Sequence, residues 1–483
     1  MSKDLGQAVT MRIASASRNI GRAFTSVALG ALVWGAATDA RAQAASTEGL
    51  ENGVALGALV ITPKLRLAMG FDSNVNLGSK EEVTGNAPEL YVGPSVGFAL
   101  REQPALRFNA NAGVSWRQYF ADSTRTRDAS GLDANVSANM QANHGGAVSF
   151  ILSDQLRQSN DAIFMPDLND DVYQISFSEY GVDLGSGRLM NNNAAIGMRI
   201  HPGGDVQDRI GFTGELRATH AFTHYHERPE SNRHRIGGDL TLAWRFLPRS
   251  SVFGEVGVQR IMYDREYSEP VTRDVLFLLN GEPTQALANN PSTPIRFGIG
   301  MRTLLTERLG LMARLGYSIA NYDKGPTISR PTAQVQLDSQ LSSWQSLRFG
   351  WATSYSDSSF ANYVNYHRLH FSYSVTPQRV RATASVFMQV NNYAEYDQQL
   401  VSPNGSVIEV YSSGDRRDIP VGLNLEVAAR LGSHVDLGLD YSLLANFSDF
   451  QAEPARDWIN GEKLSGDAEF MRHRVRLFLT LAL

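Results

Sequence analysis

The sequence predicts an all-β protein, a transmembrane antiparallel β-barrel of about 18 strands within a range of 16 to 20. Apolar and polar residues alternate with period two along most of the chain. Many of the alternating segments exceed ten residues, and the connections between them are alternately short and long. The composition agrees, because 19% charged residues is low for a soluble protein and 42% hydrophobic residues is low for a helical membrane bundle.

The composition also excludes several classes of function. The chain has no cysteine, so disulfide scaffolds, thiolate zinc sites and cysteine nucleophiles are absent. Its formal net charge of −5 over 483 residues is too small for nucleic-acid binding through bulk charge.

The first 42 residues read as a secretory signal peptide. A basic stretch precedes the apolar run AFTSVALGALVWGAAT, which is too short for a stable spanning helix. The triplet Ala40-Arg41-Ala42 fits signal peptidase, with cleavage after Ala44 as the alternative and Met11 as an alternative start. We therefore expect a signal peptide at 1–42, a short periplasmic segment at 43–60 and the barrel at 61–483.

The alternation is clearest at the C-terminus. One face carries the apolar side chains that we expect to form the assembly signal, namely Val475, Leu477, Leu479, Leu481 and Leu483. The other face carries Arg472, Arg474, Arg476, Thr480 and Ala482, with Phe478 as a bulky exception.

The same rule locates the other strands. They are expected at 61–71, 89–100, 105–119, 131–142, 147–158, 189–200, 208–224, 233–246, 251–265, 294–304, 309–322, 330–342, 347–358, 364–376, 380–394, 417–430, 435–447 and 468–483. A further pair could lie around Val172–Leu184. An even number is expected, because both chain ends of a single-chain bacterial barrel lie on the periplasmic side.

The connections favour a membrane barrel over a secreted β-sandwich or solenoid. Tight connections are expected at 101–104, 143–146, 247–250, 305–308, 376–379 and 431–434, and long polar ones at 266–293, 395–416 and 448–467. Sandwich strands usually have about five or six residues. Aromatic residues also lie near strand ends, as interface girdles require, at Tyr119, Phe120, Tyr225, Tyr263, Tyr317, Tyr322, Tyr355, Tyr366 and Phe447.

The polar face of such a barrel must line its interior, because only a closed barrel satisfies the backbone of strands in hydrocarbon. Strand parity assigns fifteen arginines to this face: Arg107, Arg117, Arg157, Arg217, Arg245, Arg296, Arg302, Arg314, Arg348, Arg368, Arg381, Arg430, Arg472, Arg474 and Arg476. It assigns eight acids: Asp133, Glu215, Asp239, Glu255, Asp338, Glu426, Asp436 and Asp440. The excess predicts a pore that favours anions, unless the arginines mainly brace the wall by pairing across strands.

Three apparent site motifs have plainer explanations. GPSVG at 93–97 matches the nucleophile-elbow pattern, but Ser95 lies inside an alternating strand rather than at a strand-to-helix turn. The histidines at 220, 224, 226 and 234 could bind a metal, although interfacial histidines near headgroups fit better. The acidic run at 167–171 lacks the spacing of an EF-hand. We therefore expect no enzyme activity, cofactor or metal; an outer-membrane hydrolase would need a Ser/His pair facing outward together.

Two segments give the chain a family resemblance. FDSNV at 71–75 ends the first expected strand, and ELYVGPSVGFAL at 89–100 carries Pro94 near the middle of the second. In these features the chain resembles the β-barrel porin type-2 family of Gram-negative outer membranes. Members often lie in exopolysaccharide or capsule loci, so the resemblance implies a part in polysaccharide secretion. The terminal Leu483 departs from the Phe typical of assembly signals.

We therefore expect a pore in a Gram-negative outer membrane that assists export of an anionic exopolysaccharide. The alternatives are a general diffusion porin for small solutes and a structural or adhesive barrel. Expected partners are outer-membrane lipid and lipopolysaccharide, the barrel assembly machinery and, for a polysaccharide substrate, a periplasmic polysaccharide export protein. A TonB-dependent receptor is not expected, because 43–60 is too short for a plug, and loop 266–293 is a candidate for an inward-folding constriction.

Overall fold

The computed structural model describes most of the predicted barrel. The described residues are 53–75, 85–101, 105–160, 189–202, 210–226, 232–264, 276–279, 282–284, 291–323, 327–357, 363–393, 397–401, 407–412, 417–448 and 469–482. The predicted signal peptide, the possible strand pair at Val172–Leu184 and the acidic run at 167–171 lie outside these residues.

Eighteen antiparallel strands form one closed barrel, as the sequence predicts. They are β2 (Leu59–Asp72), β3 (Ala87–Leu100), β4 (Leu106–Tyr119), β5 (Gly131–Ala142), β6 (Val148–Ser159), β7 (Leu189–Ile200), β8 (Gly211–Tyr225), β9 (Arg233–Leu247), β10 (Ser250–Tyr263), β13 (Ser292–Thr306), β14 (Leu309–Tyr322), β15 (Ile328–Ser342), β16 (Gln345–Asp357), β17 (Tyr363–Val375), β18 (Val380–Tyr393), β21 (Arg417–Arg430), β22 (Val435–Ser448) and β23 (Phe470–Ala482). Each predicted strand overlaps one of these with its ends within about three residues, the usual error of periodicity.

The barrel closes where its first and last strands pair. β2 bonds to β23 over Lys64↔Ala482 to Asp72↔Arg474, and to β3 on its other side. β1 (Val54–Leu56) turns back onto the start of β2, with Val54 opposite Ile61. This three-residue strand lies in the segment expected to be plain periplasmic chain, and it is too short for period-two alternation to reveal.

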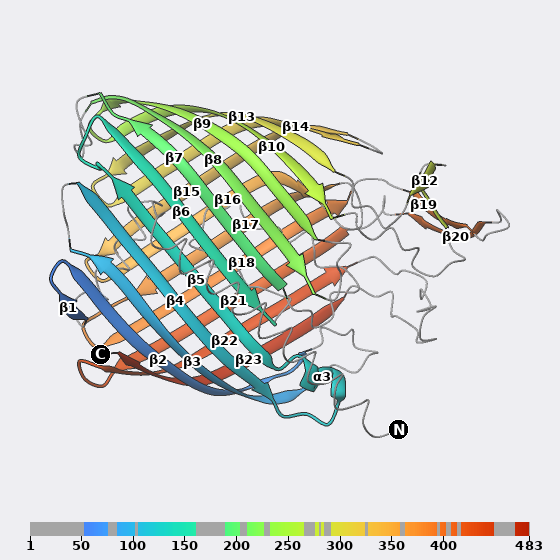
Figure 1. The fold of residues 1–483 in the computed structure, drawn as a ribbon, viewed down its shortest axis with the longest axis horizontal. Coiled ribbons are helices and arrows are strands. Elements are labelled where there is room, and N and C mark those ends of the chain that lie inside the picture. Colours follow the sequence, from blue (N-terminus) through green and yellow to red (C-terminus); the bar gives the residue numbers. More distant parts are fainter. Residues whose placement is uncertain are drawn as a thin grey trace, which may run out of the picture.

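The two ends of the barrel differ (Figure 1). At the end that carries the C-terminus, strands join through tight turns such as 247–250 and 343–344. At the other end, β4 and β5 are joined through the short helix α3 (Thr124–Asp128), which begins at the N-cap Ser123. In the described part of the chain, no helix has the length and hydrophobicity needed to cross a membrane.

Two of the long connections form a second, smaller sheet. β11 (Leu276–Leu279) pairs with β12 (Glu282–Thr284) and with β19 (Asp397–Val401), which in turn pairs with β20 (Val407–Ser412). Figure 1 places β12, β19 and β20 beyond the barrel end that carries the long loops. The described strands of 266–293 therefore do not constrict the barrel, and the expectation of an inward-folding loop is wrong for them.

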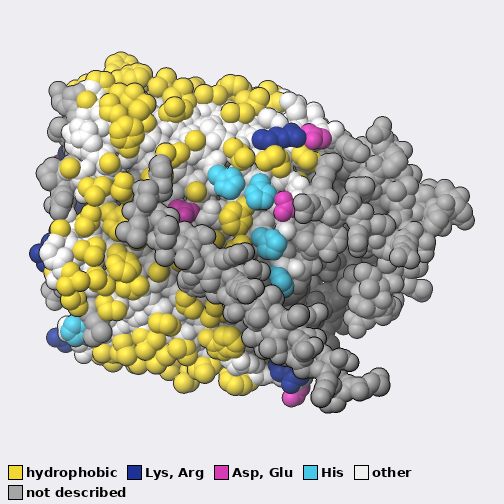
Figure 2. Space-filling model, viewed as in Figure 1, with side chains coloured by type: hydrophobic (Ala, Val, Ile, Leu, Met, Phe, Trp, Pro, Cys, Tyr) yellow, Lys and Arg dark blue, Asp and Glu magenta, His cyan; other side chains and the backbone are white. Residues whose placement is uncertain are grey.

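The outer face of the barrel is apolar. Large side chains are exposed all around it, including Met69 at 62%, Ile299 at 68% and Leu315 at 64% of their surface. Figure 2 shows this hydrophobic surface on one side of the molecule. An apolar belt of this extent on a closed sheet is stable against lipid, because contact of so much apolar surface with water is unfavourable.

The inner wall is packed as well as polar. Phe478, the bulky exception in the last strand, points inward and is 1% exposed between Ala68 and Ala428. It lies over Gly438 of β22, where a Cβ atom would come within 2.4 Å of the phenyl Cζ. A glycine on one strand thus accommodates the aromatic ring of the next.

Candidate functional site

Successive side chains of a strand point to opposite faces of the sheet, and registered partners in neighbouring strands point to the same face. Since the apolar side chains face outward, the polar side chains between them face the interior. All fifteen arginines selected by parity stand at register positions that alternate with the exposed apolar side chains. Their outward neighbours include Trp116, Leu216 and Val475, which are 41–55% exposed. The arginines therefore share the face opposite the apolar belt.

Most of these arginines are paired within the wall. At least ten of the fifteen lie within ion-pair distance of a carboxylate: Arg117 of Asp133, Arg217 of Glu215, Arg296 of Asp239, Arg314 of Glu255, Arg348 of Asp338, Arg381 of Glu426, Arg430 of Asp436, Arg472 and Arg474 of Asp72, and Arg476 of Asp440. Nine of these ten pairs join different strands and so brace the wall, whereas Arg217 and Glu215 both lie on β8.

The other five arginines have different surroundings. Arg368 lies over the Phe387 ring at 5.0 Å from its centroid, and Arg302 over Phe253 at 5.1 Å. Arg107 and Arg245 stand near the tight-turn ends of β4 and β9. Arg157 lines the recess described below.

A buried carboxylate anchors the barrel seam. Asp72 is fully buried at the end of β2 and accepts hydrogen bonds from Arg472 Nε at 2.9 and 3.0 Å. Arg474 Nε donates to the same carboxylate at 3.1 Å, and the Tyr119 hydroxyl does so at 3.3 Å. Asp72 belongs to FDSNV, so this motif supplies the acid that ties the first strand to the last.

A second chain of charges crosses the seam beside it. Arg66 on β2 reaches over β23, with its guanidinium 4.0 Å from the centre of the Phe478 ring, and donates to Asp440 at 3.1 Å. Glu426 and Asp440 stand directly opposite each other in β21 and β22, and Arg66 Nη2 is also 3.8 Å from Glu426. The arginine offsets the repulsion between these two carboxylates.

Glu89 extends the network into β3. It is 2% exposed, and its carboxylate lies 3.8 Å from Arg476 Nε and 4.0 Å from the Nε atoms of Arg117 and Arg474. No hydrogen bond from a described residue reaches either of its oxygens. Three guanidinium groups therefore compensate the buried charge by proximity.

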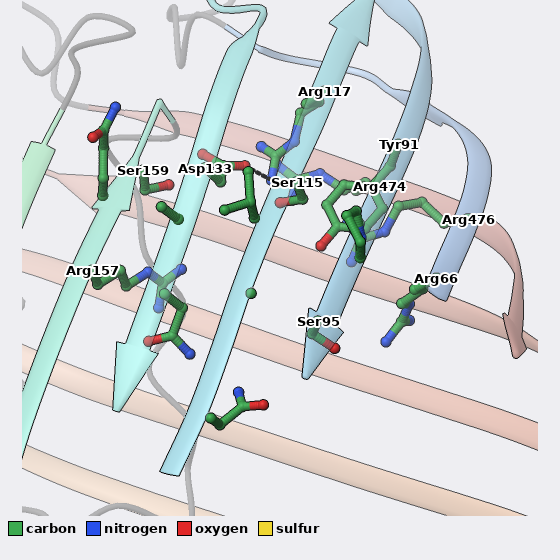
Figure 3. A pocket seen from close by; sticks show the side chains of 18 of the residues that line it. Arg66, Tyr91, Ser95, Ser115, Arg117, Asp133, Arg157, Ser159, Arg474 and Arg476 are labelled. Atoms are coloured by element: carbon green, nitrogen blue, oxygen red, sulfur yellow. Dashed lines mark ion pairs between the residues drawn. The ribbon is translucent and has the colours of Figure 1, made fainter. Parts of the chain in front are cut away.

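A recess of about 560 Å³ opens over this network (Figure 3). Six arginines line it, namely Arg66, Arg117, Arg157, Arg472, Arg474 and Arg476, together with the single acid Asp133. Figure 3 shows Arg117 beside Asp133, with Tyr91 close to Arg474 and Arg476. Amide and hydroxyl side chains, including Asn111, Asn135 and Ser95, complete the lining.

The recess is electropositive because six arginines line it against one acid, Asp133, and the other acids of the network lie deeper. The side chains of Asp72 and Glu89 have no exposed surface, and Asp440 has 11%. The side chains of Arg66 and Arg476 are 34% and 22% exposed. Arg476 donates to Asp440 through Nε. Among the described residues no group accepts a hydrogen bond from its two Nη groups, so they can donate to a solute.

Strand parity missed several residues of this network. Arg66 occupies an inward position of the first predicted strand but is absent from the predicted set. Asp72 stands one residue beyond that strand as predicted, and Glu89 begins the next one. Local alternation could have found Arg66, whereas the grouping with β22 and β23 depends on closure between residues about 400 positions apart.

The apparent motifs contribute no assembled chemistry. Ser95 lies within the continuous strand β3 and lines the recess. His220 stacks on His234 with 5.9 Å between ring centroids, and His224 Nδ1 lies 2.8 Å from the Asn232 amide. Among the described residues, no group of three or more His, Cys, Asp and Glu could hold a metal ion.

The apolar face of the last strand is also outward. Val475, Leu477 and Leu481 are 37–49% exposed, and Leu479 shares their register face, while Leu483 lies outside the described residues. Their role as an assembly signal stays a prediction.

No model of a known protein family matches the chain, and no curated protein matches it either. Its fold is similar to solved bacterial structures at low sequence identity. OccAB4 of Acinetobacter baumannii is 10% identical, with a TM-score of 0.40, over 88% of this chain and 98% of that one. OpdK of Pseudomonas aeruginosa with vanillate is 10% identical, with a TM-score of 0.41, over 88% and 99%. The siderophore receptor PirA of Pseudomonas aeruginosa is 8% identical, with a TM-score of 0.38, over 88% and 80%.

The chain's own geometry defines its class. An 18-stranded closed antiparallel sheet with an apolar exterior and a charged interior is an outer-membrane β-barrel. The protein therefore resides in the outer membrane of a Gram-negative bacterium.

Proposed function

We propose that the barrel is a pore for anionic solutes and that these solutes bind in the arginine recess as they cross it. An 18-stranded barrel leaves an interior too wide for wall side chains to fill, so a water-filled path is expected. The observation that carries the proposal is the layering of the recess wall, with Asp72 and Glu89 buried beneath more exposed guanidinium groups. A solute passing this wall meets cations first.

The substrate that this lining fits is an acidic polysaccharide. Carboxylates pair with guanidinium groups, while amides, hydroxyls and the Tyr91 ring suit the hydroxyl groups and the apolar faces of sugar rings. The resemblance carried by FDSNV and Pro94 points to the same substrate class. On this proposal, a periplasmic export protein delivers the polysaccharide to the tight-turn end of the barrel.

Bilayer recordings test the proposal. The pore should show a reversal potential of anion preference, and a short polyuronate added on the periplasmic side should block its current. Arg66→Ser together with Arg476→Ser should weaken that block by about tenfold, because each removes a partly exposed guanidinium. A neutral dextran of equal length is the control solute, and cation preference or equal block by both polymers would contradict the proposal.

A general diffusion porin is the second candidate. The same wall would then favour small organic anions, and liposome swelling assays would show their uptake without any block by polymer. In the native host, deletion of the gene should leave anionic exopolysaccharide in the periplasm if the first candidate is right. It should leave secretion unchanged if the second is right.

A further inference from the structure

One acidic side chain interrupts the lipid-facing belt. Asp154 on β6 stands between Leu152 and Leu156 on the outward face, because its register partners are Ala138 of β5 and Ala194 of β7. The residue is exposed rather than turned into the wall. It therefore faces the surroundings of the barrel at a position where lipid is expected.

The position of Asp154 is unusual for a charge. In the described strands it is the one Asp, Glu, Lys or Arg at an outward register position more than four residues from a strand end. It comes six residues after Val148, the turn-side start of β6. At about 3.3 Å per residue and a tilt of about 40°, this is about 15 Å into an apolar band about 25 Å tall.

The surface around it has low relief. Its two register partners on this face, Ala138 and Ala194, are small, while Leu152 and Leu156 flank it along β6. Large hydrophobic side chains are exposed once each on β5 and β6, at Leu132 and Phe150, but five times on β9, at Ile236, Leu240, Leu242, Trp244 and Leu247. Small residues let two backbones approach closely, as helix interfaces in membranes illustrate.

Asp154 also carries its own complement. Asn192 Nδ2 donates to Asp154 Oδ1 at 2.6 Å and to the Gln155 carbonyl at 3.3 Å. A donor amide and an acceptor carboxylate thus stand side by side on one outward patch. Two such patches related by a two-fold axis along the membrane normal match if each Asn192 exchanges its longer bond, at 3.3 Å to the Gln155 carbonyl, for one to the opposite Asp154 carboxylate.

We propose that this patch, comprising Asp154, Asn192, Ala138 and Ala194, binds a second copy of the chain in a two-fold dimer. Dimer formation removes the exposed carboxylate from hydrocarbon and adds a second amide to the one that Asn192 of the same chain supplies. A second barrel is the occupant that fits, because a partner at this depth must itself span the membrane and present matching polar groups.

The contact can continue toward the loop end of the barrel. His220 lies in the same register row, after Ala194, and stacks on His234, whose Nε2 is 3.5 Å from Asp264 Oδ1. Figure 2 shows histidines with acidic side chains beside them on this face, interrupting the apolar surface. Lipopolysaccharide headgroups could cover this outer part, but they do not reach the depth of Asp154.

Cysteine cross-linking tests the dimer directly, because the chain has no native cysteine. Ala194→Cys should give a covalent dimer when native outer membranes are oxidised. The matched control is Ala313→Cys, an outward alanine on β14 in another sector, which should remain monomeric. Equal cross-linking of both variants, or of neither, would overturn the proposal.

The role of the carboxylate is tested separately by Asp154→Leu. If lipid covers the site, this variant should be monomeric like the wild type and more resistant to heat, since a charge has left hydrocarbon. If a second copy covers it, the wild type should be a dimer by native mass spectrometry. The variant should then associate about tenfold more weakly. Heat-modifiable migration in gels shows whether each variant is folded. A folded wild type that is monomeric would contradict the proposal.

Discussion

Asp72 and Arg472 form a buried ion pair with 2.5 Å between Oδ2 and Nη2, although 400 positions separate them in the sequence. The pair fastens the end of β2 to β23, the two strands that close the barrel. Both side chains are almost inaccessible to water. The seam of the barrel therefore depends on a charge pair that neither strand could satisfy alone.

Removal of one partner should destabilise the barrel strongly. Asp72→Asn leaves Arg472 and Arg474 near an uncharged amide, and breaking a buried pair in this way costs about 3 to 5 kcal/mol. The free energy of unfolding can be measured in urea and detergent by tryptophan fluorescence. Arg249→Ala is the control, because its partner Glu307 is largely exposed, and a loss of roughly 0.5 kcal/mol or less is expected there. Equal losses in the two variants would show that the seam pair is dispensable.

The packing of Phe478 over Gly438 gives a second prediction. Gly438→Ala places a methyl group 2.4 Å from the ring and should cost about 1 to 3 kcal/mol of stability. Phe478→Leu alone loses packing and the contact with the Arg66 guanidinium. The double variant should lose less than the sum of the two single variants, because the leucine removes the contact of the methyl group with the ring, although the contact with the Val427 carbonyl at 2.6 Å remains. A simple sum in the same urea assay would mean that the ring and the glycine do not constrain each other.

Local alternation predicted the barrel well and the site only in part. Period-two patterns placed all 18 strands because every second residue of each strand faces lipid and most of these residues are apolar, as are Leu477, Leu479 and Leu481. The pattern also assigned arginines to the inner face. It could not pair Arg66 with Asp440 or Arg472 with Asp72, because these contacts arise only when the sheet closes.

The same limit explains the missed acids. Asp72 and Glu89 stand at the loop ends of their strands, where the alternation stops being informative. Their burial, not their position in the pattern, makes them the lower layer of the recess. A count of fifteen arginines against eight acids therefore overstated the number of unpaired charges, although the layering retains the positive surface.

The anion preference should fade as salt increases. Screening shortens the reach of the partly exposed Arg66 and Arg476 groups from about 10 Å at 0.1 M to about 3 Å at 1 M. Reversal potentials under a fixed twofold gradient should therefore indicate weaker anion preference in molar salt than in decimolar salt. Selectivity independent of ionic strength would indicate a steric filter instead of a charged wall.

Deletion of residues 266–290, with a short turn joining β10 to β13, should leave single-channel conductance unchanged. The described strands of this loop, β11 and β12, belong to the second sheet and lie outside the barrel, so they remove no cross-section from the path. Deletion of 395–416, which supplies β19 and β20, should have the same effect for the same reason. A rise in conductance after either deletion would place that loop in the conducting path. A control deletion in the short turn at 247–250 should instead impair assembly, because Ser250 begins β10 and pairs with both neighbouring strands.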